Sequence, residues 1–171
     1  VYKRQALAPK EVVEVVYDIT EANLAAYTQP NVGDLHARGI TESASNYYGI
    51  LYDARKDCWI IPIRTPQGKL LGWQEKGVRD RYFLNYPTGI KKSKSLFGYD
   101  KYQGGTMIVV ESPLDVVRLA SVGIMGGVAT YGTSISRDQL SLIKGAERII
   151  FAMDNDEAGK NASSEVVKRS I

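Results

Sequence analysis

Two acidic stretches stand directly after short apolar runs, where an open parallel sheet would place its chemistry. Glu111 follows Met107–Val110, and Asp154 and Asp156 follow Ile149–Met153. Residues at the carboxyl ends of parallel strands line the ligand crevice of such a sheet. Three clustered carboxylates with no cation nearby repel one another, so they favour a hard divalent metal ion. The spacing predicts one metal site formed by Glu111, Asp154 and Asp156.

Nitrogen and sulfur ligands are scarce in this chain. Cys58 is the single cysteine and His36 the single histidine. A cysteine-rich zinc site and an intrachain disulfide are therefore excluded, and a Ser-His-Asp device would depend on His36 alone. A metal must then take oxygen ligands, which predicts Mg²⁺ or Mn²⁺. No apolar run approaches the roughly 20 residues that span a bilayer, so we expect no membrane partner.

Each acid also has a structural explanation. Asp156, between a strand and a helix, would serve as an N-cap, and Asp115 would stabilise the first turn of its helix. Capping explains Asp154 less well, because it abuts the apolar run. It explains Glu111 least, since Ser112 is available to cap the next helix. The alternatives stay open for Asp156 and Asp115.

The distribution of charge is more informative than the formal net charge of +3. Between residues 76 and 94 six basic residues face one acid, Asp80, and three aromatic residues are interleaved with them. Cations follow phosphates and aromatic faces stack on bases, so the segment suits a single-stranded nucleic acid groove. A solvated hairpin with lysines on its edges explains the composition equally simply. The basic residues are Lys76, Arg79, Arg81, Lys91, Lys92 and Lys94, and the aromatic ones Tyr82, Phe83 and Tyr86.

The first hundred residues predict a mixed α+β region. Gly39 and Gly49 end two short helices, and Thr41 is a good N-cap for the second. Pro62 indicates an edge position or an irregularity in its strand. The expected elements are short helices over Glu21–Tyr27 and Asp34–Arg38, a helix from the Thr41 cap through Tyr48, and antiparallel strands over Trp59–Arg64 and Lys69–Lys76 with a turn at 65–68.

From about residue 104, strands and helices alternate, which predicts parallel strands with right-handed crossovers. Ser112 is a candidate N-cap, Pro113 suits the first helical position, and Gly132 permits a tight turn. We expect strands over Thr106–Val110, Gly127–Thr130 and Arg148–Met153, and helices over Pro113–Ser121, Ser136–Ile143 and Glu157–Arg169. The fold class is therefore α/β: a mostly parallel sheet with flanking helices over residues 103–171, preceded by a smaller α+β, basic subdomain over residues 1–102.

Three stretches together resemble the Toprim fold, which DnaG-type primases, topoisomerases and some nucleases share. The last is similar to the Asp-x-Asp-x-Ala-Gly signature of primases, and Gly132-Thr133 with Gln139 downstream looks more primase-like than topoisomerase-like. The stretches are Val110-Glu111-Ser112-Pro113-Leu114-Asp115, Tyr131-Gly132-Thr133-Ser134 and Met153-Asp154-Asn155-Asp156-Glu157-Ala158-Gly159.

The resemblance extends upstream and spans about residues 35 to 169. Primases usually carry glycine after the motif glutamate, whereas this chain has Ser112-Pro113. The family also has a later acidic segment, so we expect the Toprim domain to be truncated at its C-terminus after Ile171. A zinc module and a Walker A motif are absent from these 171 residues. The upstream stretches are His36–Thr41, Ile61–Arg64 with Gly68 and Gly72, Arg81–Asn85 and Lys92–Gly98.

The resemblance implies the catalytic core of a DnaG-type DNA primase from a bacterium, phage or plasmid, acting in the cytoplasm. It would join ribonucleoside triphosphates on a single-stranded DNA template, beside a replicative helicase. Glu111, Asp154 and Asp156 would hold Mg²⁺ or Mn²⁺, with Asp115 supporting catalysis. The residues implied to bind nucleic acid or nucleotide are Arg38, Arg81, Lys92, Lys94, Gly132 and Thr133.

Two other functions fit the same residues. A Toprim nuclease would use water in place of a 3′-hydroxyl as the nucleophile and would hydrolyse phosphodiesters. A non-catalytic fragment would bind DNA or nucleotide without turnover. A fold does not determine a function, so both stay open at this point.

Overall fold

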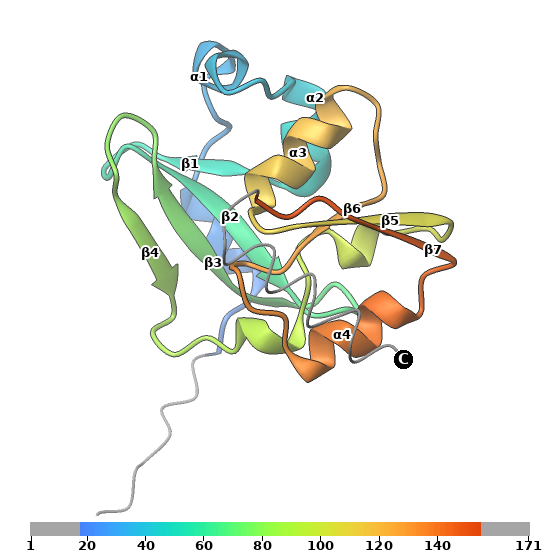
Figure 1. Ribbon diagram of the computed structural model, residues 1–171. Coiled ribbons are helices and arrows are strands. Elements are labelled where there is room, and N and C mark those ends of the chain that lie inside the picture. The colour runs from blue at the N-terminus through green and yellow to red at the C-terminus, as the bar shows by residue number, and fades with distance from the viewer. Residues whose placement is uncertain (1–17, 155–171) are drawn as a thin grey trace, which may run out of the picture.

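Two sheets meet in the computed structural model, which describes residues 18–154 (Figure 1). The first sheet is antiparallel, with strand order β1-β2-β3-β4, and the second is parallel, with order β6-β5-β7. Asp156 and the helix expected over Glu157–Arg169 lie outside the described residues. The strands are β1 (Leu51–Asp53), β2 (Cys58–Arg64), β3 (Leu70–Gly77), β4 (Phe83–Tyr86), β5 (Thr106–Val110), β6 (Gly127–Ala129) and β7 (Arg148–Phe151).

The helices begin and end largely where local signals predict. Thr41 caps α2 by accepting a hydrogen bond from Ala44 N at 3.2 Å, and Gly49 ends it in the left-handed region at φ 71°. The first α-helix starts two residues earlier than expected, because Asn31 caps it. The helices are α1 (Val32–Ala37), α2 (Glu42–Tyr48), α3 (Pro113–Ser121) and α4 (Arg137–Lys144), with 3₁₀ turns η1 (Glu21–Ala26), η2 (Lys92–Lys94) and η3 (Tyr99–Lys101).

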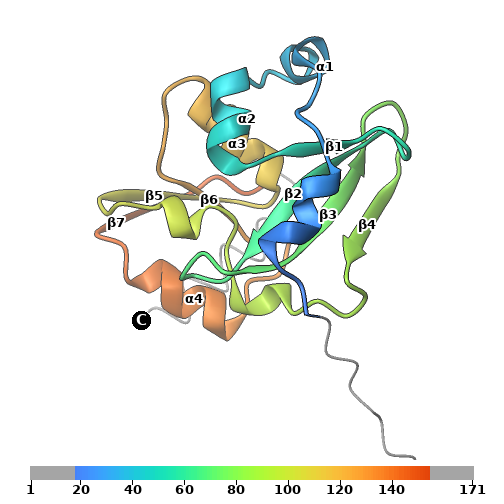
Figure 2. The same cartoon turned by 180° about the vertical axis from the view of Figure 1, so that it is seen from behind.

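Strand β2 is buried on both faces, which explains its unbroken apolar run. Ile60 packs with Leu24 of η1 on one face, and Trp59 and Ile61 face α2 and α3 on the other. Figure 2 shows η1 lying over the first of these faces. Although β2 is an inner strand, Pro62 lies beyond its pairing with β1, so β2 is locally an edge here, and the register with β3 shifts just after it, between Ile63 and Arg64. Pro62 is tolerated because the pairing with β1 ends at Ile60, so no ladder bond is lost on that side.

Gly72 lets β4 approach β3 closely. A Cβ at this position would stand 2.1 Å from the carbonyl oxygen of Tyr86 and 2.7 Å from Cδ of Pro87. A backbone oxygen cannot rotate away, so Gly72→Ala should lower the free energy of unfolding by about 1–3 kcal/mol. Urea denaturation measures the change.

Gly145→Ala is the matched control for Gly72→Ala. Gly145 has helical dihedral angles, and the atom nearest to an added methyl carbon would be Leu142 O at 3.4 Å. The alanine should be neutral or stabilise by about 0.4–1 kcal/mol through the unfolded state. Equal losses in the two variants would contradict the close approach of β4.

The parallel sheet is covered by α3 on one face and α4 on the other (Figure 1). Along β5, Met107 and Val109 pack toward Ile143 of α4, whereas Val110 packs toward α3. The segment at Phe97 adds a further bridge, because Phe97 and Ala129 exchange two backbone hydrogen bonds of 3.0 Å. No helix within residues 18–154 is long and apolar enough to cross a membrane.

The two sheets share one hydrophobic core. Leu35, Trp59 and Ile61 from the first part pack in the same cluster as Val110 and Val117 from the second. All five are at most 4% exposed, and burying a side chain of this size contributes about 1.5–3 kcal/mol. The division of the chain at residue 102 stays a prediction. Residues on both sides of it contribute to the same hydrophobic core.

An ionic contact ties α1 to the turn between β1 and β2. Arg79 pairs with Asp34 and with Asp57, and Tyr52 Oη donates to Asp57 Oδ1 at 2.7 Å. Two hydrogen bonds hold the pKa of Asp57 below its usual value of 3.8, and the one from Tyr52 has a larger effect than the one from Arg79. A carboxyl whose pKa is lower in the folded state stabilises the fold above its unfolded pKa, and that contribution is lost as the pH falls through the folded pKa.

Asp57→Asn should therefore lose stability at neutral pH and converge on the parent in acid. Asparagine tolerates the left-handed φ of 49° at this position and still accepts the Tyr52 bond, so the charge is the main change. Urea denaturation between neutral pH and about pH 3 measures the gap between the two proteins. A gap that stays constant over this range would rule out the charge as its cause.

Candidate metal and nucleotide site

Glu111 and Asp154 lie side by side at the carboxyl ends of neighbouring strands. Strands β5 and β7 are paired in parallel, with Val109 opposite Phe151, so their following residues emerge at one edge. The backbone N–H of Asp154 donates to Glu111 Oε1 at 3.2 Å. Two of the three expected carboxylates are thus neighbours, and Asp156 lies outside the described residues. Within residues 18–154 no group of three His, Cys, Asp or Glu side chains is arranged to hold a metal.

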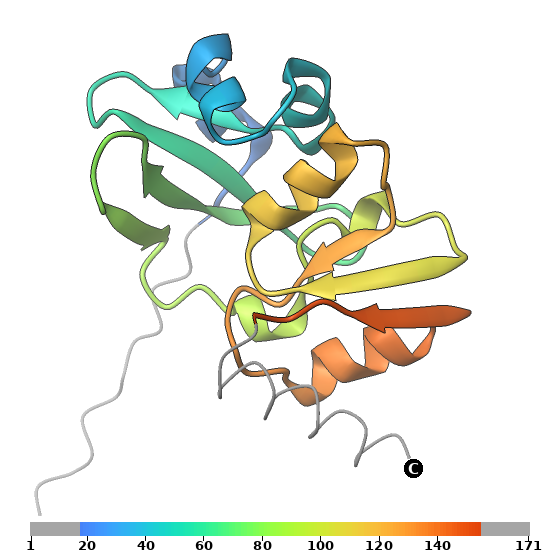
Figure 3. The same ribbon diagram turned by 45° about the horizontal axis from the view of Figure 1, so that its top comes forward.

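A hollow of about 220 Å³ opens at these acids, and we call it the acidic hollow. In Figure 3 the strands of the parallel sheet point toward β3 and β4, so the first sheet forms the opposite wall. Its lining combines the two acids with the start of α3, the loop after β6, and two residues of the first sheet. These residues are Gln74, Phe83, Glu111, Ser112, Pro113, Tyr131, Gly132 and Asp154.

A second hollow of about 320 Å³, the lysine hollow, lies on the other side of the same loop. Tyr131 and Gly132 line both hollows. Burial lowers the pKa of Lys92, so an anion bound beside this ammonium would stabilise its charge. The lysine hollow is lined by Lys92, Ser93, Thr130, Tyr131, Gly132, Thr133, Ser134, Ile135, Ser136 and Gln139.

The loop after β6 turns at Tyr131. Tyr131 has a left-handed φ of 67°, whereas Gly132 is not in that region, so this turn does not use the left-handed conformation that glycine would allow. The Tyr131 ring packs edge-on against Phe97 at a centroid distance of 6.5 Å, and burial raises its pKa. Thr130 Oγ1 donates to the carbonyl of Gly132 at 2.6 Å. Packing rather than glycine holds this turn, and such strained residues cluster at functional sites.

Gln139 joins the two walls of the lysine hollow. Its side chain is 2% exposed, and Nε2 donates to Ser95 O and to Thr130 O, each at 3.0 Å. Its Oε1 accepts from Ser136 N at 3.1 Å, while Ser136 Oγ accepts from Gln139 N. One buried amide thus links the segment that carries Lys92 to the loop that carries Thr133. In the sequence, Gln139 stands out only through the family resemblance.

Four of the expected site residues do not line either hollow. Asp115 pairs with Arg118 at 2.6 Å, one turn into α3. The Arg38 guanidinium donates to Val78 O at 3.0 Å and lies 5.6 Å from the ring centre of Trp59. Arg81 and Lys94 are exposed. The structure therefore brings together Glu111, Asp154 and Gly132 in one hollow and Lys92, Gly132 and Thr133 in the other.

Sequence reasoning missed Gln74 and did not place Phe83 beside the acids. Phe83 stands out in the sequence only as one of three aromatic residues in the basic segment and as part of the upstream stretch Arg81–Asn85. The pairing of Phe83 with Lys76 places it on the same face of the hairpin as Gln74, two residues from Lys76. That face contributes to the acidic hollow. Only the register of β4 reveals this, and the register depends on a pairing that local sequence does not specify.

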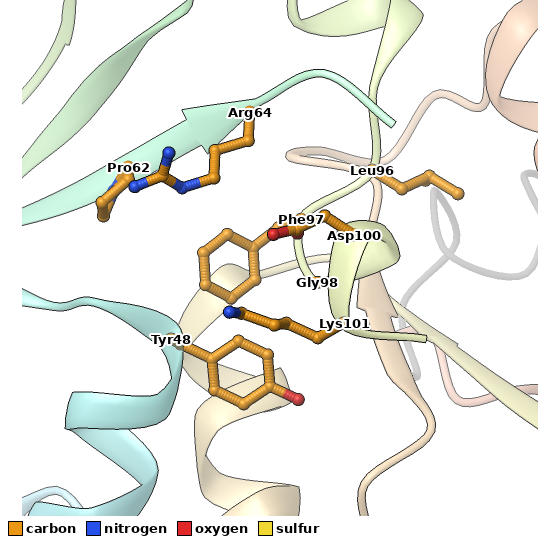
Figure 4. Close-up of a pocket in the computed structure, with 8 residues that line it drawn as sticks. All are labelled: Tyr48, Pro62, Arg64, Leu96, Phe97, Gly98, Asp100 and Lys101. Carbon is orange, nitrogen blue, oxygen red and sulfur yellow. The ribbon is translucent and has the colours of Figure 1, made fainter. Parts of the chain in front are cut away.

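A smaller cavity of about 20 Å³ lies between Pro62 and Arg64 of β2 and the segment before β5 (Figure 4). Tyr48, Phe97 and Lys101 stand close together in it, and the rings of Tyr48 and Phe97 are 5.5 Å apart. This volume is enough for about one water molecule. The cavity is therefore too small for a nucleotide.

Known proteins match the same parts of the chain. Residues 105–170 match the family model described as Toprim domain. A DNA primase of Deinococcus radiodurans is 32% identical over 140 residues, which cover 75% of this chain and 24% of the relative. The chain contains a Toprim domain of the kind found in DnaG-type primases. It spans about a fifth to a quarter of the length of the curated relatives it matches.

Solved structures show the same core fold around the Toprim domain. A DnaG primase catalytic domain bound to ssDNA superposes with a TM-score of 0.72 at 22% identity, covering 87% of this chain and 64% of that one. The primase fragment of the bacteriophage T7 primase-helicase protein superposes with a TM-score of 0.66 at 24% identity, covering 84% and 66%. The expected α/β class, with a parallel sheet preceded by an α+β part, is confirmed.

Proposed function

We propose that this chain is the catalytic core of a DNA primase, which joins ribonucleotides on a single-stranded DNA template. One observation carries the proposal: Glu111 and Asp154 meet at the carboxyl ends of β5 and β7 in a Toprim domain. In this proposal residues 103–171 are the catalytic Toprim domain, and residues 1–102 are the subdomain that binds nucleic acid. Asp156 and Asp115 complete the proposed catalytic set.

The donor set at the strand ends fits a hard divalent ion. Glu111 and Asp154 offer carboxylate oxygens, and no histidine or cysteine lines the acidic hollow within the described residues. Oxygen ligands favour Mg²⁺ or Mn²⁺. Glu111, Asp154 and Asp156 are the residues that would hold it. When bound, the ion neutralises the triphosphate and stabilises charge at the attacking and leaving oxygens.

The side chains of this protein supply the remaining interactions. Lys92 lies in the lysine hollow, where its ammonium can bind phosphate oxygens, and Thr133 offers a hydroxyl from the opposite wall. Gly132, which lines both hollows, leaves room for a ligand because, apart from its two chain neighbours, no described residue has an atom within 4 Å of the Cβ it lacks. Arg81 and Lys94 would hold the template backbone from the surface, and Arg38 would contribute less because its guanidinium is already bonded to Val78 O.

The partners follow from the same proposal. Single-stranded DNA is the template, ribonucleoside triphosphates are the substrates, and a replicative helicase acts beside the primase. The structural relatives named above include one bound to ssDNA and one from a primase-helicase, which supports both macromolecular partners. Primer synthesis would take place in the cytoplasm of a bacterium or of a phage-infected cell.

One assay tests the proposal against its competitors. The protein is incubated with single-stranded DNA, labelled ribonucleotides and Mg²⁺ or Mn²⁺, and the products are separated by size. New oligoribonucleotides that require both template and metal support a primase. Shortened DNA would instead identify a nuclease, and salt-dependent DNA binding without any product would indicate a non-catalytic fragment.

A further inference from the structure

Phe83 is the most exposed of the three aromatic residues of the basic segment, since Tyr86 is 36% exposed and Tyr82 is half-buried. Tyr82 Oη donates to Glu75 Oε2 at 2.6 Å, and the Tyr86 ring stacks on Trp73 at 4.7 Å. Phe83 is 53% exposed, and no ring within residues 18–154 stacks on it. Half of a large apolar surface is thus left in contact with water, which is typical of a binding surface when the residue lines a hollow.

The register of β4 turns this ring toward the acids. Phe83 lines the acidic hollow together with Glu111 and Asp154. Leu84, the next residue, is 39% exposed but is paired with Glu75 and so faces the opposite side of the sheet. Phe83, rather than Leu84, is therefore the exposed apolar side chain that the acidic hollow offers to a ligand.

The size of the acidic hollow limits what it can hold. Its volume of about 220 Å³ is below the roughly 300–1,000 Å³ of pockets that enclose a whole drug-sized ligand. A hollow of this size suits one flat ring system, and the charged part of the ligand would then lie at Glu111 and Asp154. A nucleotide combines a planar ring that has polar edges with phosphates that a divalent metal can bind. The ring that fits the acidic hollow would therefore be a nucleobase.

We propose that the Phe83 ring is the stacking platform for a nucleobase held at Glu111 and Asp154. This inference rests on the proposed function, because it takes a nucleotide or a DNA strand to be the ligand of that site. Every base has a π-face, so stacking gives affinity with little dependence on base identity. Phe83 contacts the base, whereas Glu111 and Asp154 would hold the divalent ion that binds the phosphates.

Two ligands distinguish the source of the base. ATP with Mn²⁺ tests the base of a substrate nucleotide, and a short oligo(dT) tests the base of a template. Phe83→Ala should weaken the binding of at least one of them roughly 5- to 150-fold. Phe83→Tyr should restore the affinity because it keeps an aromatic face, and Phe83→Leu should not. Calorimetry or fluorescence anisotropy measures the affinities.

Tripolyphosphate with Mn²⁺ and the Leu84→Ala variant are the controls. Tripolyphosphate has no base, so Phe83→Ala should leave its affinity unchanged. Leu84→Ala removes a neighbouring apolar side chain on the opposite face and should leave all three ligands unaffected. The stacking role would be overturned if leucine restored binding as well as tyrosine, if tripolyphosphate affinity fell in parallel, or if neither base-bearing ligand lost affinity.

The outcomes separate this inference from the proposed function. Loss of ATP or oligo(dT) affinity in Phe83→Ala, in a protein that makes no primers, would retain the stacking role and reject primase activity. Primer synthesis by the parent, with unchanged affinities in Phe83→Ala, would retain the primase and reject the stacking role.

Discussion

Replacing Glu111 by glutamine should reduce template-dependent primer synthesis at least about 100-fold. Glutamine keeps the size of the side chain and an oxygen that can accept the hydrogen bond from Asp154 N, so the fold should persist. It removes the negative charge that we propose to hold the divalent ion. Charge stabilisation by a metal contributes several kcal/mol to the transition state, and each 1.36 kcal/mol corresponds to about a factor of ten in rate. The assay is primer synthesis at saturating Mg²⁺ or Mn²⁺.

A second measurement on the same variant does not depend on turnover. An ion that binds only the folded protein raises the melting temperature, so Mn²⁺ should stabilise the parent more than Glu111→Gln. Glu147→Gln is the matched control, because Glu147 precedes β7 at the opposite end of the strand from Asp154. Normal synthesis by Glu111→Gln, together with an undiminished Mn²⁺ shift, would reject the assignment of Glu111.

Gln139→Glu should cost about 3–5 kcal/mol of unfolding free energy, the range for an uncompensated buried charge. The new carboxylate oxygen would replace the Nε2 group that donates to Ser95 O and Thr130 O, so it would face two carbonyl oxygens without a proton to give. A protonated glutamic acid can satisfy only one of the two. The folded state therefore favours the protonated form, and the destabilisation should grow as the pH rises above the ordinary glutamate pKa. Urea denaturation at several pH values measures both effects.

Gln67→Glu provides the control, since Gln67 is exposed in the turn between β2 and β3. It should change stability by no more than about 0.5 kcal/mol. The idea that the buried amide holds the two segments together would be rejected by either of two results. One is a similar loss of unfolding free energy in both variants, and the other is a loss in Gln139→Glu that does not change with pH. In the expected case, nucleotide binding at Lys92 should weaken along with stability, because Gln139 links both walls of that hollow.

Local signals predicted the elements that are stabilised locally. Thr41 and Gly49 bound α2, and Ser136 with Gln139 begins α4, because caps satisfy backbone groups within a few residues. The meeting of Glu111 and Asp154 followed from topology, since parallel neighbours end at one edge. Pro62 indicated an edge or an irregularity and stands where the pairing of β2 with β1 has ended, but the inner place of β2 in the sheet depends on β1, which is not a local property.

The wall opposite the acids was beyond local prediction. A shift of one residue in the pairing of β3 with β4 would have turned Leu84 rather than Phe83 into the acidic hollow. Glycine preference likewise pointed to Gly132, whereas the contact of Tyr131 with Phe97 makes Tyr131 the left-handed residue. The hydrogen bond from the Arg38 guanidinium to Val78 O, far along the chain, was likewise beyond local prediction, and the nucleic-acid role that the resemblance implies for Arg38 stays a prediction.

The core shared by the two sheets has a consequence for ligand affinity. Trp59 and Ile61 pack against the same cluster as Val110 and Val117, so the wall that carries Phe83 and the edge that carries Glu111 are parts of one packed interior. Packed interiors resist deformation. A ligand that touches both walls finds them already in place and loses little free energy to closing them, which is the advantage of a preorganised site.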